Sequence, residues 1–283
     1  MPKYATDDIR NIALVGHGST GKSTLAEGIL FDAKTITRRG SIDDGSSVSD
    51  FDPQEKERNC SINLSVMHAP WGGKEFNILD APGYPDYIGG AFEALAAADT
   101  AVILVSAPAG IEVNTRLMWE KAGELGLARI LVVNKMDADN VDFPKLLEEI
   151  KNNFGNACTP MVLPVGQSGS FTGVVSTLNV PSDVPAGVLG GDPESMNAEL
   201  MESVLEADDA LLEKYLGGEE VGEDEIKGIL PKALVAGTIV PMFCTNARDD
   251  IGLPELMNFV ANFAPSPTQA TRPTARQGEE EVT

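Results

Sequence analysis

The sequence is poor in the side chains that form disulfides and bind transition metals. Its three cysteines, Cys60, Cys158 and Cys244, form no C-x-x-C pair, and only two histidines occur among 283 residues. A disulfide framework needs closely spaced cysteine pairs, and a zinc site needs clustered Cys or His ligands. We therefore expect neither, and we expect a protein of the reducing cytoplasm.

Long apolar runs are also missing. No run reaches the roughly 18 residues of a membrane span, and the start of the chain, MPKYATDDIR, lacks the apolar core of a signal peptide. The sequence therefore predicts no membrane partner.

Basic residues are outnumbered: 21 Lys and Arg stand against 43 Asp and Glu, which gives a formal charge of -22. Such a surface repels nucleic-acid phosphates, so direct sequence-specific nucleic-acid binding is not expected. The acidic surface is consistent with a role in solubility or with a salt-adapted source. It is also consistent with the binding of a protein partner. Composition does not choose between these readings.

Strand and helix patterns alternate along the first half of the chain. NIALVGH predicts a strand, and STLAEGILFDA predicts a helix with Leu25, Ile29 and Leu30 on one face. DTAVILVSA and ARILVVNKMD are β-branched runs typical of interior parallel strands, and the helix expected between them ends near Gly126. INLSVMHAPW and KEFNILDAPG predict a strand pair joined by WGGK. This spacing predicts an α/β, doubly wound, mostly parallel sheet.

The remaining segments set the expected domain boundaries. Residues 35–59 are polar and aperiodic, which predicts a long mobile loop. Residues 156–238 predict an inserted α+β subdomain with short antiparallel strands and a helix over 194–216, followed by a short helix that Pro231 breaks or kinks. Residues 1–155 and 239–265 then form the two parts of the main domain. Residues 266–283 predict a linker or disordered tail.

One short motif carries the strongest functional signal. GHGSTGKS, residues 16–23, matches G-x-x-x-x-G-K-[ST] and lies between a predicted strand and a predicted helix. There, backbone amides form an anion nest, Lys22 reaches the β- and γ-phosphates, and the Ser23 hydroxyl binds Mg²⁺. The alternative, a glycine-rich turn with an exposed lysine, does not explain why the motif lies between a strand and a helix. The candidate nucleotide-binding residues here are Gly16, His17, Gly18, Ser19, Thr20, Gly21, Lys22, Ser23 and Thr24.

Two further motifs follow in order. DAPG supplies Asp80, which is expected to hold Mg²⁺ through water, and Gly83, whose amide is expected to sense the γ-phosphate. NKMD supplies Asn134, Lys135 and Asp137 to the nucleotide site. A carboxylate at Asp137 can accept both N1–H and the 2-amino group of guanine, and adenine offers neither donor. The order of the motifs therefore favours GTP over ATP, and competition by ATP would test this.

These segments together resemble the GTPase domain of translational elongation factors, most closely elongation factor G and its paralogues. The resemblance runs from Ile9 to Pro267 and rests on NIALVGHGSTGKSTL, DFDPQEKERNCSI, LDAPGYPDYIGG, VVNKMD, FCTNA and FAPSP. An insertion of about 80 residues after NKMD matches the extra subdomain of elongation factor G. The resemblance implies the P-loop NTPase fold, GTP or GDP with Mg²⁺, and the ribosome as partner of a full-length protein. The chain ends where the second domain of the family would begin, and we expect a monomer.

The resemblance also assigns further residues and shows departures. Thr245, Asn246 and Ala247 fall in the guanine-binding loop, where the Ala247 amide is expected to meet O6 and Asn246 replaces a serine. Ser61 replaces the threonine that contacts Mg²⁺ and the γ-phosphate, and it keeps the hydroxyl. Gly18 and Cys60 stand where the family has two apolar residues beside the attacking water, so the apolar gate is thinner.

The last departure concerns catalysis. Tyr84 stands where the family has the histidine that orients the attacking water. A tyrosine hydroxyl can hydrogen-bond water but cannot be protonated as imidazole is. Lys22, Gly83 and Tyr84 are the candidate catalytic residues, and slow GTP hydrolysis is expected. The alternatives are a GTP- or GDP-responsive regulatory module without hydrolysis, and a Tyr84 that only packs beneath the loop.

Overall fold

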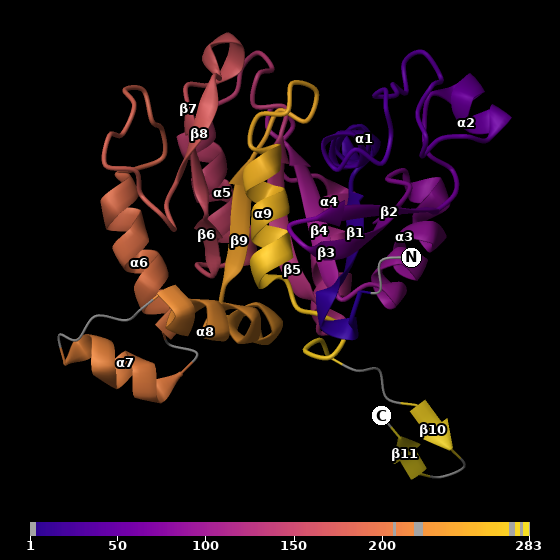
Figure 1. Ribbon diagram of the computed structural model, residues 1–283. Helices are drawn as coiled ribbons and strands as arrows, with labels where there is room; N and C mark the ends of the chain where they lie inside the picture. The colour runs from indigo at the N-terminus through magenta and orange to yellow at the C-terminus, as the bar shows by residue number, and fades with distance from the viewer. Residues whose placement is uncertain (1–3, 206–207, 218–222, 272–274, 278–279, 283) are drawn as a thin grey trace.

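A computed structural model describes residues 4–205, 208–217, 223–271, 275–277 and 280–282. Seven strands of the described chain form one sheet in the order β2-β3-β1-β4-β5-β9-β6, with helices on both faces (Figure 1). This confirms the predicted α/β, doubly wound, mostly parallel fold. The strands of this sheet are β1 (Ile9–Gly16), β2 (Ser65–Trp71), β3 (Lys74–Asp80), β4 (Thr100–Ser106), β5 (Ala128–Asn134), β6 (Cys158–Pro160) and β9 (Val240–Cys244).

The direction of the strands decides where the site lies. β1 runs parallel to β3 and β4, β5 runs parallel to β4 and β9, and β6 runs parallel to β9. Only β2 is antiparallel, and it pairs with β3 through a two-residue turn at Gly72 and Gly73, both with positive φ, as WGGK predicts. The carboxyl ends of the parallel strands therefore meet at one edge, where ligands bind in open α/β sheets.

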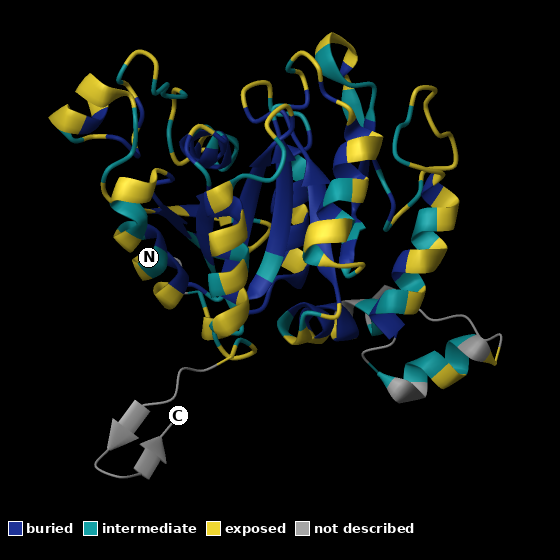
Figure 2. Ribbon diagram, turned by 180° about the vertical axis from the view of Figure 1, so that it is seen from behind, coloured by how far each residue is buried: buried dark blue, intermediate teal, exposed yellow. Residues whose placement is uncertain are grey.

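The sheet is covered on both faces. The helices α1 (Lys22–Asp32) and α9 (Leu253–Phe263) pack together on one face, and α8 (Glu223–Ala236) contacts α9 and β5. The opposite face carries α3 (Ile88–Ala97), α4 (Val113–Glu124) and α5 (Phe143–Phe154). Every residue of β4 is buried, as expected for a central strand between two helix layers, and the sheet is the dark blue centre of Figure 2.

The segment from 156 to 238 shares the main core. Its first strand, β6, extends the main sheet, while β7 (Val162–Val165) and β8 (Gly173–Ser176) form the expected antiparallel pair. Leu200 of α6 (Pro193–Leu205) and Leu234 of α8 belong to the same hydrophobic cluster as the central strands. Helix α8 continues through Pro231.

Three segments differ from the sequence expectations. The single helix expected over 194–216 is two helices, because Asp208 caps a new one, α7 (Asp209–Leu216), by accepting the Leu211 N–H. The loop expected over 35–59 contains α2 (Pro53–Arg58), which has a capping box. The tail, expected without regular structure, contains the antiparallel strands β10 (Ala275–Gln277) and β11 (Glu280–Val282). Three 3₁₀ turns complete the elements: Thr6–Asp8, Pro85–Tyr87 and Ser168–Ser170.

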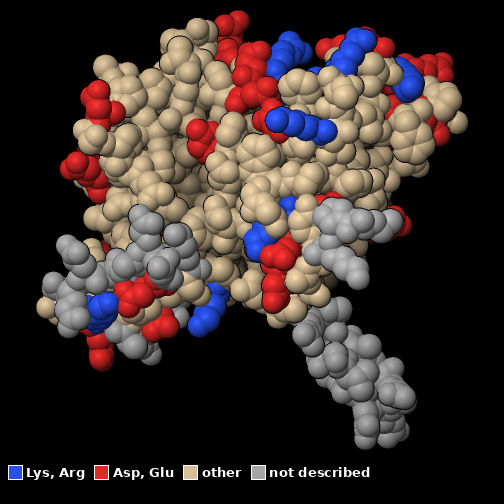
Figure 3. Space-filling view, viewed as in Figure 1, with Lys and Arg blue, Asp and Glu red and all other residues tan. Residues whose placement is uncertain are grey.

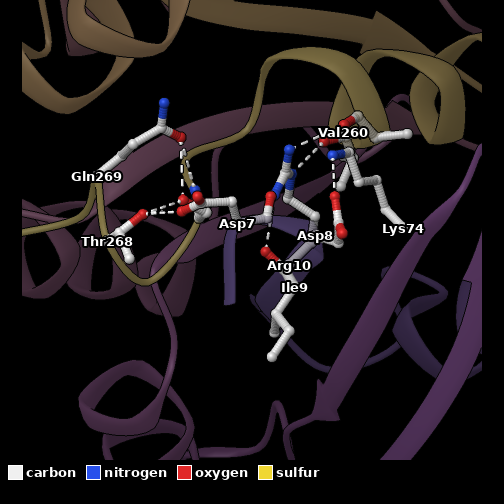
Figure 4. A network of polar contacts seen from close by, with 10 residues as sticks. Asp7, Asp8, Ile9, Arg10, Lys74, Val260, Thr268 and Gln269 are labelled. Carbon is white, nitrogen blue, oxygen red and sulfur yellow. Dashed lines mark hydrogen bonds and ion pairs between the residues drawn. The ribbon is translucent and has the colours of Figure 1, made fainter. Parts of the chain in front are cut away.

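A polar network ties the start of β1 to the end of α9 (Figure 4). The buried Arg10 donates to the carbonyls of Val260 at 3.3 Å and Ala261 at 3.1 Å. Beside it, Thr268 donates to Asp7, and Lys74 pairs with Asp8 at 2.6 Å. Segments at opposite ends of the sequence are thereby joined at the edge of the sheet away from the carboxyl ends. In the part of the chain described, no helix is long and apolar enough to cross a membrane.

Candidate nucleotide-binding site

The phosphate loop follows β1 and leads into α1. Only glycine fits at two of its positions, because a Cβ on Gly16 would lie 2.5 Å from the Leu104 carbonyl oxygen and one on Gly21 would lie 2.3 Å from the Asn134 side chain. Both glycines also have positive φ. The loop is therefore held tightly against β4 and β5, with the first turn of α1 beginning at Lys22.

Lys22 lies at the centre of the site. Its ammonium group donates to the His17 carbonyl at 2.8 Å, and its side chain is buried. Burial lowers the pKa of Lys22 to about 8, and the carboxylates of Asp80, Asp50 and Glu112 oppose this shift. The Lys22 ammonium group donates to two loop carbonyls, and phosphate oxygens would stabilise the buried charge further.

Asn134 joins the three loops that the sequence assigns to the nucleotide. Its Nδ2 donates to the Thr20 carbonyl at 2.9 Å, and its Oδ1 accepts from the Thr245 hydroxyl at 3.1 Å and from the Ala247 N–H at 3.0 Å. The residue is buried, so these bonds are shielded from water. One amide side chain at the end of β5 thus connects the phosphate loop with the loop after β9.

The residues expected to read the base belong to the two loops that follow β5 and β9. Asp137 is exposed, and Lys135, in a left-handed conformation with φ of 64°, lines the same cavity as the phosphate loop. The Ala247 N–H that we expect to meet guanine O6 is engaged by Asn134 in this structure. Asn246 shapes its own loop, because its Oδ1 accepts from the Arg248 N–H at 3.1 Å. The roles of these residues toward the base stay predictions.

The residues expected to hold Mg²⁺ lie together. The hydroxyls of Ser23 and Ser61 are 3.2 Å apart, although they come from α1 and from the loop before β2. Asp80 is fully buried at the end of β3, where the Ser49 hydroxyl donates to its Oδ2. Burial raises the pKa of Asp80, and the hydroxyls of Ser23 and Ser49 act in the opposite direction.

A second carboxylate, Asp50, was not identified from the sequence. Burial raises its pKa to about 6, the Ser61 hydroxyl lowers it, and neighbouring Asp80 raises it further. Oδ1 of Asp80 and both carboxylate oxygens of Asp50 are buried without a hydrogen bond of good geometry. Two hydroxyls and two such carboxylates form an oxygen-only set, which fits Mg²⁺ held directly and through water. No cluster of three or more His, Cys, Asp or Glu side chains suited to a metal occurs among the residues described.

Gly83 and Tyr84 close over the phosphate loop. A Cβ on Gly83 would lie 2.6 Å from the His17 carbonyl oxygen and 2.8 Å from the Gly18 nitrogen, so only glycine allows this approach. Asn114 at the start of α4 donates to the Gly83 carbonyl at 2.7 Å and fixes the peptide. The Tyr84 ring covers Gly18, where a Cβ would lie 3.0 Å from the ring, and its hydroxyl is 3.2 Å from the Ser19 hydroxyl. Tyr84 is 40% exposed, so it is not packed beneath the loop.

The cavity has a volume of about 520 Å³ and an unusual rim for such an acidic protein. It is bounded by the phosphate loop, by residues 39–43 and 59–61, by Gly83 and Tyr84, and by Lys135 and Arg248. Several basic groups lie near the helices α1 and α2 at the top of Figure 3, with acidic groups among them. On the cavity wall itself, four basic residues face two acidic ones, Glu27 and Asp43, and this balance favours phosphates.

His17 and Cys60 flank the site. The His17 ring lies 3.4 Å from a carboxylate oxygen of Glu112 on the side of α4, and its carbonyl rather than its ring accepts from Lys22. Cys60 lines the cavity together with Gly18, and burial raises the pKa of its thiol. Gly18 and Cys60, which replace the two apolar residues that flank the attacking water in the family, thus line the same cavity as Tyr84.

These features define a P-loop nucleotide-binding protein of the GTPase class. Residues 7–266 match the family model described as the elongation factor Tu GTP binding domain. The chain therefore belongs to that family, and it is a GTP-binding domain of the elongation-factor type.

Relatives agree with this assignment. The chain is 33% identical to elongation factor G 2 of Syntrophus aciditrophicus over 280 residues, which cover 94% of this chain and 41% of that protein. It is 33% identical to elongation factor G of Thermotoga sp. strain RQ2, over 92% of this chain and 39% of that protein. The crystal structure of ttk003000868 from Thermus thermophilus superposes with a TM-score of 0.84 at 32% identity, over 93% of this chain and 41% of that one. The chain thus spans about two fifths of these relatives.

Proposed function

We propose that the domain binds GTP and GDP with Mg²⁺ at the carboxyl edge of its sheet and hydrolyses GTP slowly, as part of a translation factor whose partner is the ribosome. The observation that carries the proposal is the Asn134 junction, which joins the phosphate loop and the loop after β9 around one cavity. A monomer in the cytoplasm, without sequence-specific nucleic-acid binding, is part of the same proposal.

The chemistry needs little from the protein beyond position and charge. Lys22 and the amides of the phosphate loop hold the phosphates, and Asn134 and Asp137 orient and select the base. Bound Mg²⁺, held by Ser23 and Ser61 directly and by Asp80 and Asp50 through water, would neutralise phosphate charge. Gly83, pressed against Lys22 and fixed by Asn114, is placed to respond to the γ-phosphate through its amide.

Tyr84 limits the rate in this proposal. Its hydroxyl faces Ser19 rather than a charged partner, and the ring rests on Gly18. It can hydrogen-bond water but cannot carry the extra proton of an imidazolium near neutral pH, so the stabilisation of the attacking water is weak. Isolated GTPases of this kind turn over at roughly 10⁻⁴ to 10⁻² per second, and we place this domain near the lower limit.

The test is single-turnover hydrolysis of GTP by the wild type and by Tyr84→His and Tyr84→Phe, with and without ribosomes. Histidine is expected to raise the rate by about a hundredfold or more, the scale of one general acid–base group, whereas phenylalanine is expected to leave GTP affinity intact. An unchanged rate for Tyr84→His in both conditions would show that Tyr84 does not limit hydrolysis.

A second function is favoured by the same tyrosine. With the Tyr84 hydroxyl paired to Ser19 and glycine at the gate position, the domain would act as a GTP- or GDP-responsive module that regulates a partner without hydrolysis. Multiple-turnover assays with ribosomes separate the two functions. A hydrolase releases more than one equivalent of phosphate per protein, and a module without hydrolysis does not.

A further inference from the structure

The loop after α1 makes a second connection that the motifs do not contain. Arg39 lies in this loop, and its guanidinium group reaches across to the guanine loop, defined here as residues 245–250. Its Nη1 donates to the Arg248 carbonyl at 3.0 Å, and its Nη2 donates to the Ala247 carbonyl. Nη1 also pairs with Asp250 at 2.7 Å. One side chain thus holds two carbonyls of this short loop by hydrogen bonds and one carboxylate by an ion pair.

The position of this guanidinium group is fixed from the other side. It rests against α1 at Gly28, where a Cβ would lie 2.3 Å from Arg39 Nη2 and 2.6 Å from Leu253. The neighbouring Gly40 N–H donates to the buried carboxylate of Glu27 on α1 at 2.9 Å. Glu27 also accepts from the Ser47 hydroxyl at 3.0 Å. The segment that follows Arg39 is therefore anchored on Glu27 of α1 at Gly40 and at Ser47.

The surrounding charges are consistent with a built contact. Arg39 and Asp250 are only 21% and 35% exposed at their side chains, and the carboxyl of Asp32 has a raised pKa from burial and from Asp250, opposed by Arg39. By contrast, the nearby pair of Arg248 and Asp43 is 3.6 Å apart and 78% and 83% exposed. An exposed ion pair of this kind adds little stability. The contacts of Arg39 therefore hold the loop after α1 against the guanine loop.

We propose that Arg39 is a positioning residue for guanine recognition, which holds the Ala247 region in place for the base and thereby couples base binding to the order of the loop after α1. This rests on the proposed guanine site. The Ala247 N–H donates to the buried Asn134 side chain, and its carbonyl accepts from the half-buried Arg39, so the residue is held from both sides. Arg39 touches neither the Mg²⁺ residues nor Tyr84, so it acts on nucleotide retention rather than on the chemical step.

The experiment measures release of fluorescent GDP in Mg²⁺ from the wild type, Arg39→Ala and Arg38→Ala. Arg38 is the matched control, since it is the adjacent arginine and is exposed. Arg39→Ala is expected to release GDP about tenfold faster, the scale of one charge-assisted hydrogen bond, and Arg38→Ala is expected to behave as the wild type.

Inosine diphosphate separates positioning from a direct role at the base. It keeps O6 but lacks the 2-amino group that Asp137 is expected to read, so Arg39→Ala should weaken GDP and inosine diphosphate by the same factor. A double-mutant cycle with Asp250→Asn tests the ion pair: the double variant is expected to release GDP no faster than Arg39→Ala alone.

The outcomes distinguish this inference from the proposed function. A wild type that retains no GDP overturns the guanine site itself. A wild type that binds GDP normally, with Arg39→Ala releasing it as slowly as Arg38→Ala, overturns only the role of Arg39. A loss of thermal stability in Arg39→Ala without faster release would show a structural role and would also overturn the inference.

Discussion

At the scale of single residues, the site depends on a few buried titratable groups whose pKa values are shifted by burial. Lys22 is the clearest case, because burial holds its pKa at about 8 and the free protein loses this positive charge above that pH. The phosphates of a bound nucleotide favour the charged ammonium form and raise its pKa again. Between the two pKa values, binding must therefore take up a proton.

This predicts that GDP affinity falls as pH rises above about 8, by up to tenfold per unit, the limit for one linked proton. Calorimetry in two buffers of different ionisation enthalpy measures the uptake directly, and about one proton is expected at pH 8.5 against nearly none at pH 7. Lys121→Ala, at a half-buried helix position outside the site, is the control and should match the wild type. Binding at pH 8.5 without proton uptake would contradict the assignment of the low pKa to Lys22.

The sequence could locate the motif residues at this scale but not their neighbours. GHGSTGKS, DAPG and NKMD have spacings that chemistry constrains, and the structure brings Lys22, Ser23, Asp80 and Asn134 together at one edge. Asp50 stands in a polar, aperiodic segment, so no pattern marked its carboxylate as buried beside Asp80. Asn114 and Arg39 were missed for the same reason, since their role comes from contacts with distant loops.

At the scale of elements, the loop between α1 and β2 is better ordered than its composition indicates. The sequence predicted an aperiodic mobile loop because Gly, Ser and Asp dominate it, yet buried carboxylates replace apolar contacts there. Glu55 in α2 accepts from the N–H groups of Ile62 and Asn63, both at 2.9 Å, and from Asp52 at 3.1 Å. These three bonds close the segment that carries Ser61.

Glu55→Ala is therefore expected to loosen residues 52–63, because three backbone donors lose a buried charged acceptor. The local cost is about 2 to 3 kcal/mol for such bonds, and Mg²⁺-dependent GTP affinity should fall because Ser61 is displaced. Trypsin cleavage after Lys56 or Arg58 measures the loosening, with Glu57→Ala at an exposed position of the same helix as control. Cleavage of Glu55→Ala as slow as that of Glu57→Ala would show that the segment is held elsewhere.

At the scale of the whole molecule, strand periodicity and β-branched runs were enough to predict the parallel sheet, because strands buried on both faces need unbroken apolar sequence. Periodicity did not predict the break in the helix expected over 194–216, because the apolar spacing continues past Asp208. The Asp208 side chain nevertheless caps a new helix. How the two ends of the chain meet was also not predictable, since Arg10 reads as an ordinary charged residue.

Arg10 is expected to be important for stability and not for nucleotide binding. It is 5% exposed, and besides Val260 and Ala261 it donates to the carbonyls of Asp7 at 2.9 Å and Ile9 at 2.8 Å. Arg10→Ala removes all four bonds and should lower the free energy of unfolding by about 2 to 4 kcal/mol, as for other buried charged hydrogen-bond donors. Urea unfolding of the variant and the wild type measures this loss.

The matched control for Arg10 is Lys74→Ala, which breaks the more exposed pair with Asp8 and should cost less than about 1 kcal/mol in the same urea experiment. The network lies at the end of β1 opposite the phosphate loop, so GDP affinity of folded Arg10→Ala should equal that of the wild type. A loss of GDP affinity as large as the loss of stability would mean that the two ends of β1 are coupled. Arg10 would then contribute to nucleotide binding as well as to stability, contrary to this prediction.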